Sequence, residues 1–172
     1  MTYILAVICS VAVLAADQIS KLLVVNNYEQ LIGGFPIIKN LINFTYVQNG
    51  GAAFGMFNSK KWLIIAVTVI IIVMCIGLLI KKSFSSKTMF WAICLVLAGG
   101  VGNLIDRIFR NGYVVDFIQF DFFKSFPVFN IADIAVCVGA GLILLCFIVD
   151  FVNESKQGKK SERPKDNADK YE

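Results

Sequence analysis

The sequence predicts an all-α membrane protein, a bundle of four transmembrane helices with a small extracytoplasmic β-sheet and an interfacial segment rich in aromatic residues. The first observation behind this prediction is composition. The 172 residues are 58% hydrophobic and 16% charged, whereas soluble domains are nearer half apolar and a quarter charged. The second observation is that the apolar residues form four stretches, each long enough to cross about 30 Å of hydrocarbon as a helix.

Each apolar stretch is expected to be a helix, because lipid offers no partners for backbone N–H and C=O groups. The predicted spans are residues 3–25, 62–80, 89–108 and 131–151. Although the first stretch is similar to a secretory signal peptide, we interpret it as a retained span, because no side-chain charge precedes it and polar residues lie near its end. Residues 1–152 then form one integral membrane domain, and residues 153–172 a disordered cytoplasmic polar tail.

Two outer segments connect the spans. In residues 26–60, the stretch 40–48 alternates apolar with polar residues and is flanked by glycines, a pattern that predicts a strand and a small sheet on the outer membrane face. Residues 111–129 contain six phenylalanines. Aromatic residues at this level suit a segment that dips into the lipid head groups.

Basic residues predict the orientation. The turn between the second and third spans carries Lys81, Lys82 and Lys87 without an acid, and the tail holds five lysines and one arginine. The positive-inside rule places both on the cytoplasmic side, so both termini are cytoplasmic, although the outer segments also contain basic residues. The net charge of +4 comes mostly from the tail, which we interpret as solvated and weakly attracted to lipid head groups. No aromatic residue lies between its basic residues, so nucleic acid is not an expected partner.

The chain has no histidine, which excludes Ser-His and Cys-His catalysis and His-ligated zinc. Its five cysteines all lie within predicted spans, and none belongs to a CxxC pair. We interpret them as small apolar packing residues. No disulfide framework, metal site or cofactor is therefore expected.

Carboxylates lie at the outer ends of three of the four spans: Asp17, Asp106 and Asp133. Charges at the edge of the hydrocarbon are costly, so they usually mark a functional site. Asp17 and Lys21 are four residues apart on one helix face and can pair. That pair either anchors the first span or braces a site.

The third span ends in a polar group after several glycines, which permit tight helix packing. Asn103 and Asp106 share a helix face, whereas the adjacent Asp106 and Arg107 do not face each other, so each is expected to have a partner on another helix. Asn49 and Gly51 belong to a loop of small residues that lets the backbone approach a ligand closely. Taken alone, that loop is equally consistent with a simple turn into the second span.

Asn130 and Asp133 have the spacing of a helix capping box, which accounts for them without any function. A second reading pairs Asp133 with Asp116 in the outer aromatic segment. Two nearby carboxylates at low dielectric share one proton, so that one activates water and the other polarises a peptide carbonyl. Such a pair hydrolyses an amide without metal, histidine or a covalent intermediate. The sequence leaves open which aspartate is the base.

The chain resembles the lipoprotein signal peptidases, also called signal peptidase II, in five motifs that occur in the family's order. They are Asp17-x-x-x-Lys21, Asn49-x-Gly51-x-Ala53-Phe54, Gly102-Asn103-x-x-Asp106-Arg107, Val115-Asp116-Phe117 and Phe129-Asn130-x-Ala132-Asp133. Each motif alone is weak, but the ordered set on four spans is highly specific.

The resemblance implies a multi-pass aspartic endopeptidase of the bacterial cytoplasmic membrane with its active site near the outer face. It would remove signal peptides from prolipoproteins by cleaving before a diacylglyceryl-modified cysteine. Asp116 and Asp133 match the family's catalytic dyad. Positions that match residues lining or supporting the site are Asp17, Lys21, Asn49, Gly51, Asn103, Asp106, Arg107, Asn130 and Ala132. Implied partners are diacylglyceryl-modified prolipoproteins, membrane lipids and lipopeptide inhibitors of the globomycin type.

Two other classes of protein fit four spans with outer carboxylates. A small ion-coupled transporter subunit would place polar groups near the midplane with access from both sides, yet the inner halves of the second and fourth spans are almost wholly apolar and no inverted repeat is present. In a structural assembly factor, the acids would only brace helices. Substitution of Asp116 and Asp133 distinguishes these classes from a protease.

Overall fold

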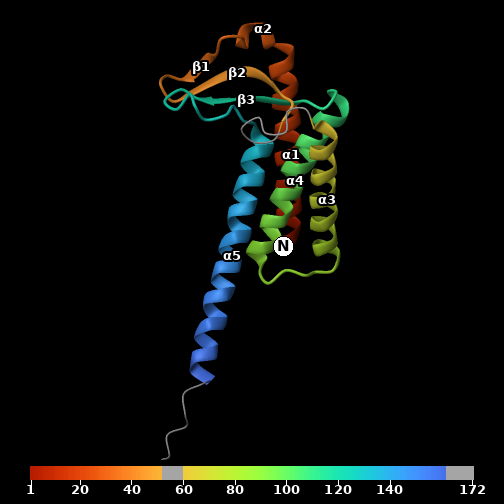
Figure 1. Cartoon of the computed structure of the whole chain (residues 1–172), viewed down its shortest axis with the longest axis vertical. Coiled ribbons are helices and arrows are strands. Elements are labelled where there is room, and N and C mark those ends of the chain that lie inside the picture. The colour runs from red at the N-terminus through yellow and green to blue at the C-terminus, as the bar shows by residue number, and fades with distance from the viewer. Residues whose placement is uncertain (52–59, 162–172) are drawn as a thin grey trace, which may run out of the picture.

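The computed structural model describes residues 1–51 and 60–161, with side chains up to residue 156. Within these residues four helices are long and apolar enough to cross a membrane, which confirms the predicted four-helix architecture (Figure 1). They are α1 (Thr2–Asn26), α3 (Lys61–Ile80), α4 (Lys87–Phe109) and α5 (Ile131–Ser161). Helix α4 is central and packs against the other three. Ala53 and Phe54, part of one sequence motif, lie outside the described residues.

Helix α5 is longer than the span predicted from the sequence. It continues to Ser161 and projects beyond the other helices (Figure 1). Residues 152–157 contain neither proline nor glycine and include Glu154 and Lys156, which favour helix, so nothing ends the helix at the edge of the apolar stretch. The first part of the predicted polar tail is therefore helical, and the remainder, residues 162–172, lies outside the described residues.

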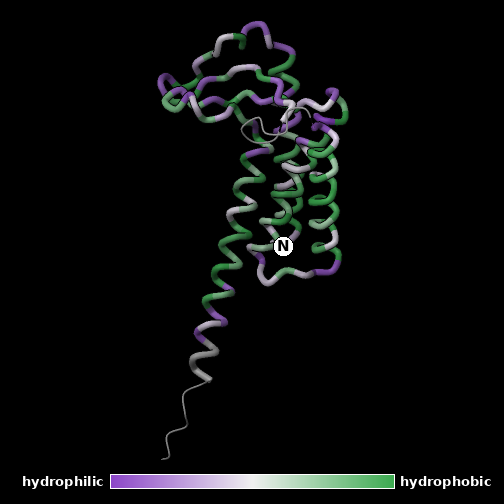
Figure 2. Tube along the Cα trace, in the orientation of Figure 1, coloured by the Kyte–Doolittle hydropathy of each residue, from purple (hydrophilic) through white to green (hydrophobic). Residues whose placement is uncertain are grey.

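The helices are apolar on the outside and carry charges on the inside. Large hydrophobic side chains such as Trp62, Leu144 and Phe151 are exposed, whereas Asp17 and Lys21 are fully buried. Figure 2 shows the hydrophobic colour along the helices and the hydrophilic colour at the sheet and in the turn at the opposite end. A water-soluble protein has the reverse arrangement, so this surface suits hydrocarbon.

A three-stranded antiparallel sheet in the order β1-β2-β3 lies at one end of the bundle (Figure 1). Its strands are β1 (Phe35–Ile38), β2 (Ile42–Asn49) and β3 (Val114–Phe120), and a short helix α2 (Tyr28–Leu31) precedes them. The predicted strand in the first outer segment is thus present. Strand β3 falls inside the segment that the sequence analysis treated as interfacial and aromatic, and its pairing with β2 sets Asp116 opposite Val47.

Glycines let α4 approach its neighbours closely. A Cβ at Gly99 would collide with the carbonyl oxygen of Ala132, and a Cβ at Gly102 would lie 2.7 Å from Oδ2 of Asp17. A Cβ at Gly139 would lie 2.8 Å from the carbonyl oxygen of Ala92. These positions hold the start of α5 and the middle of α1 against α4.

We expect Gly99→Ala to lower the thermal stability of the protein. The new methyl group meets the backbone of Ala132, which cannot move without shifting the first turn of α5. Gly141→Ala is the matched control, because a Cβ there meets nothing within 4 Å. Melting temperatures of the two purified variants in one detergent provide the measurement. Equal melting temperatures would show that the close approach at Gly99 is unimportant.

Candidate active site

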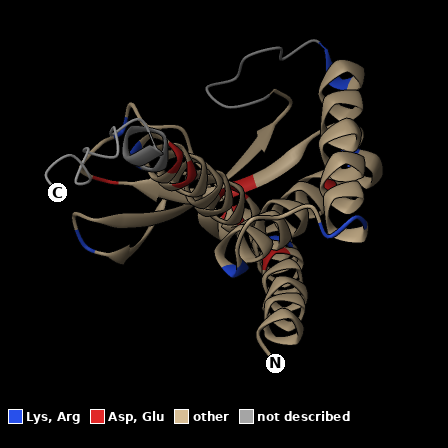
Figure 3. Cartoon of the chain, turned by 90° about the horizontal axis from the view of Figure 1, so that it is seen from below, with Lys and Arg blue, Asp and Glu red and all other residues tan. Residues whose placement is uncertain are grey.

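Polar side chains from several elements meet where the bundle joins the sheet. Figure 3, a view along the bundle, shows acidic segments among the helices near the centre of the molecule. Asp17, Asp106, Asp116 and Asn130 are all almost completely buried. The structure therefore brings together residues that lie more than a hundred positions apart in the chain.

Asp116 lies on β3 and is 2% exposed. Its Oδ2 accepts a hydrogen bond of 2.9 Å from Nδ2 of Asn49, and its Oδ1 accepts one of 2.6 Å from Nδ2 of Asn130. Asn49 is the last residue of β2, and β2 pairs with β3, so the sheet places the Asn49 amide next to Asp116. Strand pairing thereby fixes both the position and the orientation of the carboxyl group.

Asp133 is the third residue of α5 and forms the expected capping box with Asn130. Its backbone N–H donates to Oδ1 of Asn130 at 2.9 Å, and its Oδ2 accepts from the backbone N–H of Asn130 at 3.2 Å. Its Oδ1 accepts from Nδ2 of Asn103 at 2.8 Å. The predicted capping box is therefore present, and because Asn130 also donates to Asp116, one residue links the two carboxyl groups.

The pKa of Asp116 is raised from 3.8 to about 7, chiefly by burial and in addition by the negative charge of Asp133. Hydrogen bonds from Asn49 and Asn130 and the positive charge of Lys21 oppose this shift. The net pKa near neutrality means that this carboxyl group readily holds a proton in the folded protein.

Lys21 is fully buried and its ammonium group has three partners. Its Nζ lies 2.9 Å from Oδ2 of Asp17 and 3.2 Å from Oδ2 of Asp106, and it donates to Oδ1 of Asn103 at 3.0 Å. Oδ1 of Asn103 also accepts from Asn130 at 3.2 Å. With its oxygen occupied twice, the Asn103 amide must direct its NH₂ group towards Asp133.

The two acids beside Lys21 bind backbone N–H groups next to Asp133 and Asp116. Oδ1 of Asp17 accepts from the backbone N–H of Ala132 at 2.9 Å, and Oδ2 of Asp106 accepts from the backbone N–H of Val115 at 3.1 Å. These N–H groups immediately precede Asp133 and Asp116 in the chain. The Asp17–Lys21 pair predicted from spacing is therefore present, and it braces the site as well as the first helix.

Arg107 connects α4 to the loop after β2. Its Nη2 donates to the carbonyl oxygen of Gly51 at 3.1 Å, and Gly51 N–H donates to Oδ1 of Asn49 at 2.9 Å. Asp106 has the predicted partner on another helix, Lys21 of α1. The described partners of Arg107 are instead the loop residue Gly51 and Asn103 of its own helix. The buried Nε of Arg107 has no hydrogen-bond partner among the described residues.

Two cavities adjoin Asp133. One, of about 390 Å³, lies between α3, α4 and α5 and has a mainly apolar lining that includes Val67 and Ile71. The other, of about 320 Å³, lies beside β3 and the aromatic segment and is lined by Asp116 and Phe129, among others. Asn103, Arg107, Asp133 and Val136 line both.

Sequence reasoning missed two contributors. Helix α3 supplies much of the apolar wall of the larger cavity, and its sequence carries no signal beyond hydrophobicity. Gln18 donates through Nε2 to Oδ2 of Asp17 at 3.0 Å and to the carbonyl oxygen of Gly102 at 3.1 Å. Its position next to Asp17, near the outer end of the first span, is a signal that could have identified it.

The chain is similar to known proteins over most of its length. The family model described as signal peptidase (SPase) II matches residues 9–149. A curated relative, the lipoprotein signal peptidase of Caldanaerobacter subterraneus subsp. tengcongensis, is 41% identical over 147 residues, which are 86% of this chain and 97% of that protein.

Two solved structures described as bacterial membrane enzymes are each 35% identical to this chain. One has a TM-score of 0.79 and covers 86% of this chain and 90% of its own, and the other has a TM-score of 0.73 and covers 83% and 91%. Together with the four apolar helices, these matches identify a multi-pass membrane enzyme and decide against the transporter and assembly-factor alternatives. The chain belongs to the signal peptidase II family of membrane aspartic peptidases.

Proposed function

We propose that this enzyme, which removes signal peptides from prolipoproteins, cleaves immediately before a diacylglyceryl-modified cysteine and uses Asp116 and Asp133 as its catalytic dyad. The observation that carries this proposal is the single amide of Asn130, which binds Asp116 through Nδ2 and caps the helix turn of Asp133. It holds two carboxyl groups together at the meeting point of two cavities.

In this mechanism Asp133 is the base and Asp116 carries the shared proton. Asp133 lies in the first turn of α5, where the helix dipole favours a negative charge. Asp116 lies on a strand without such a dipole, and its pKa of about 7 favours the protonated form.

The reaction then balances without a covalent intermediate. Asp133 takes a proton from water as the water oxygen attacks the peptide carbonyl carbon, while Asp116 donates its proton to the carbonyl oxygen. The resulting tetrahedral diol collapses as Asp116 recovers a proton from one hydroxyl and Asp133 gives its proton to the leaving amine. The C–N bond breaks, and the dyad returns to its starting protonation state.

The two cavities suit the two halves of a lipid-modified substrate. The cavity between α3, α4 and α5 has an apolar lining that suits an acyl chain, and the cavity beside β3 lies next to Asp116 and suits the peptide. A diacylglyceryl group buries many methylenes at about 0.8 kcal/mol each. Partitioning into the bilayer supplies much of that energy before the substrate meets the enzyme. A lipopeptide inhibitor of the globomycin type would occupy the same space.

We place the enzyme in the bacterial cytoplasmic membrane with both termini cytoplasmic and the sheet at the outer face. The acid-free turn 81–87 between α3 and α4 lies at the end opposite the sheet (Figure 1), and its lysines support this orientation. Residues 1–152 would form the peptidase domain in this arrangement.

Matched substrates test the proposal. A prolipoprotein with a diacylglyceryl group on its cysteine and the same protein without that group are incubated with the enzyme in one bilayer composition. We expect cleavage of the lipidated form only, because the acyl chains align it at the dyad. Equal cleavage rates would contradict lipid recognition, and the result would then describe a general peptidase at the membrane surface.

The pH dependence follows from Asp116. We expect cleavage to fall as the pH rises through about 7, where Asp116 loses the proton that polarises the carbonyl. Its pKa is raised in the fold, so its protonated form stabilises the fold fully below pH 3.8, and this contribution is lost as the pH rises to about 7. Asp116→Asn does not titrate. The melting temperature of the wild type, measured relative to that variant, should therefore decrease over this range and level off above it; a constant difference would contradict the assignment.

A further inference from the structure

A third cavity lies at the end of the bundle opposite the dyad. Its volume is about 610 Å³, within the range of small-ligand sites. Its floor is apolar and comes from α4 and α5, with Met89, Ile93, Ile143 and Phe147 among the lining residues, whereas Lys82 and Asp150 stand at its rim. An apolar floor beneath two opposite charges is an amphipathic site.

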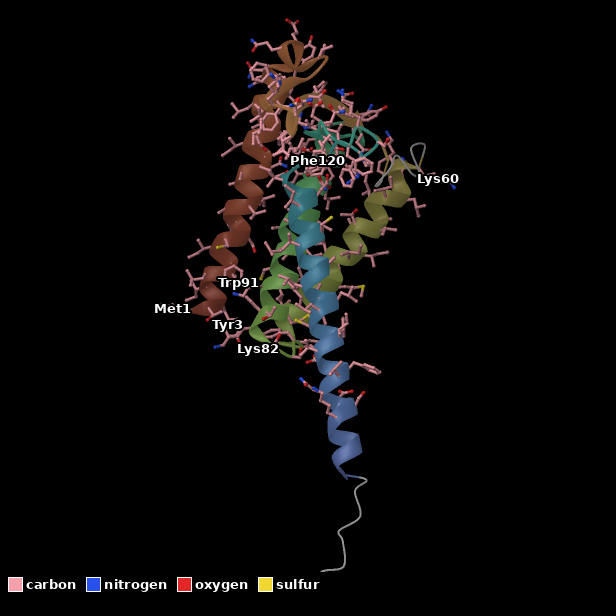
Figure 4. The ribbon with its side chains drawn as sticks, turned by 90° about the vertical axis from the view of Figure 1, so that its left-hand side faces the viewer. Met1, Tyr3, Lys60, Lys82, Trp91 and Phe120 are labelled. Atoms are coloured by element: carbon pink, nitrogen blue, oxygen red, sulfur yellow. The ribbon has the colours of Figure 1, made fainter. Side chains whose placement is uncertain are left out.

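The depth of this cavity corresponds to a membrane interface. Phe84 lines it and packs against Tyr3 and Phe90, with ring centroids 5.9 and 5.2 Å away. Aromatic clusters of this kind collect where head groups meet acyl chains. Figure 4 shows Tyr3 and Lys82 near the same end of the bundle, far from Phe120 and Lys60. The floor therefore faces the acyl region, and the rim faces the head groups.

The two rim charges have no protein partners. Among the described residues, neither the Lys82 ammonium nor the Asp150 carboxylate forms a hydrogen bond or ion pair. They are not paired with each other either, so the rim offers one cation and one anion to a ligand. This charge pattern fits a ligand that itself carries both signs.

Lys82 is held in an unusual backbone conformation. Its φ is 51°, and the N–H groups of Lys82 and Ser83 bond back to the carbonyls of Leu79 and Leu78, which is the pattern of a Schellman motif at the end of α3. Glycine is the usual residue at such a position because a side chain there is strained. A lysine in place of glycine at a cavity rim suggests that its ammonium group is needed there.

We propose that this cavity binds a zwitterionic phospholipid whose head group joins a phosphate to a primary ammonium, as in phosphatidylethanolamine. The Lys82 ammonium and the hydroxyls of Ser83 and Ser85 receive the phosphate, Asp150 receives the lipid ammonium, and an acyl chain lies along the apolar floor. An anionic lipid would place its excess negative charge beside Asp150, which disfavours it. The site is separate from the dyad and does not depend on the peptidase mechanism.

Native mass spectrometry of the full chain in detergent tests this site. The protein is equilibrated separately with equal amounts of phosphatidylethanolamine, phosphatidylglycerol and diacylglycerol. We expect preferential retention of phosphatidylethanolamine, reduced about fivefold by Lys82→Asn and by Asp150→Asn. Lys81→Asn is the matched control, since Lys81 neighbours Lys82 but does not line the cavity, and it should retain the lipid fully.

Stability separates lipid binding from folding. Asparagine tolerates positive φ, so Lys82→Asn should melt no lower than the wild type in lipid-free detergent. If Lys82→Asn and Asp150→Asn instead both lower the lipid-free melting temperature, the two residues pair with each other and the proposal is wrong. Equal retention of phosphatidylglycerol or diacylglycerol by the wild type, or unchanged retention of phosphatidylethanolamine by both variants, would also overturn it.

Discussion

Asp116→Asn and Asp133→Asn are each expected to reduce cleavage by about two to four orders of magnitude, the usual contribution of a positioned acid or base. Asparagine has nearly the shape of aspartate but cannot exchange the proton. For Asp116→Asn the loss should be largest below pH about 7, where Asp116 of the wild type holds its proton, and it should shrink as the pH rises through that value. Single-turnover cleavage of a lipidated prolipoprotein provides the measurement.

Folding must be monitored in the same variants. Asp121→Asn is a suitable control, because Asp121 is another acid of the outer segment. Its described side-chain partners, Lys124 at 3.7 Å and Asn43 at 3.1 Å, do not belong to the candidate site. We expect that control to cleave normally and all three variants to remain monodisperse. Near-normal turnover in either dyad variant would remove that residue from the catalytic pair.

Lys21→Met is expected to destabilise the protein by about 3–5 kcal/mol, because it leaves the buried carboxylate of Asp17 without its cation. Asp106 keeps only Arg110, a partly exposed cation 3.3 Å away. Asp17 and Asp106 are both at most 1% exposed and lie 2.9 and 3.2 Å from Nζ of Lys21. Activity should also fall, since the Asn103 amide loses the donor that fixes its orientation towards Asp133. Thermal unfolding in detergent and cleavage assays measure the two effects.

Lys124→Met provides the comparison. Its ammonium lies 3.7 Å from Asp121 and is 75% exposed, so the loss of that pair should cost at most about 1 kcal/mol. If Lys21→Met and Lys124→Met melted at the same temperature, the buried network would contribute nothing to stability. The Lys21→Met variant should be assayed at a temperature well below its melting temperature, where it is folded. Normal cleavage under these conditions would show that Lys21 does not position Asn103.

The spans and the polar positions were predictable because each has a local cause. The length of each apolar stretch predicts the four helices, and the helical repeat of about 3.6 residues places Asp17 and Lys21 on one helix face. The capping spacing of Asn130 and Asp133 is equally local, and so is the divergence of Asp106 from Arg107. These features depend on residues within about one helix turn of each other, which is the range that a single sequence reports.

The remaining features depend on contacts between distant segments. Asp106 of α4 binds the Lys21 ammonium together with Asp17, and no residue near Lys21 in the sequence predicts this contact. Strand β3 was not predicted because its aromatic residues suited an interfacial segment equally well, and only pairing with β2 decides between them. The role of Ala132 is carried by its backbone N–H, which no residue type reveals. The length of α5 reflects the absence of a stop signal after the apolar stretch.

The most direct test of the peptidase assignment is incubation of the purified full-length protein in a bilayer with a diacylglyceryl-modified prolipoprotein, with the products identified by mass spectrometry. We predict a released signal peptide and a mature lipoprotein that begins at the modified cysteine. The reaction should continue in the presence of chelators, and it should be absent with Asp116→Asn or Asp133→Asn. An intact substrate, a cut at another bond, or cleavage that a chelator stops and a divalent ion restores would contradict a metal-independent aspartate dyad acting before the lipidated cysteine.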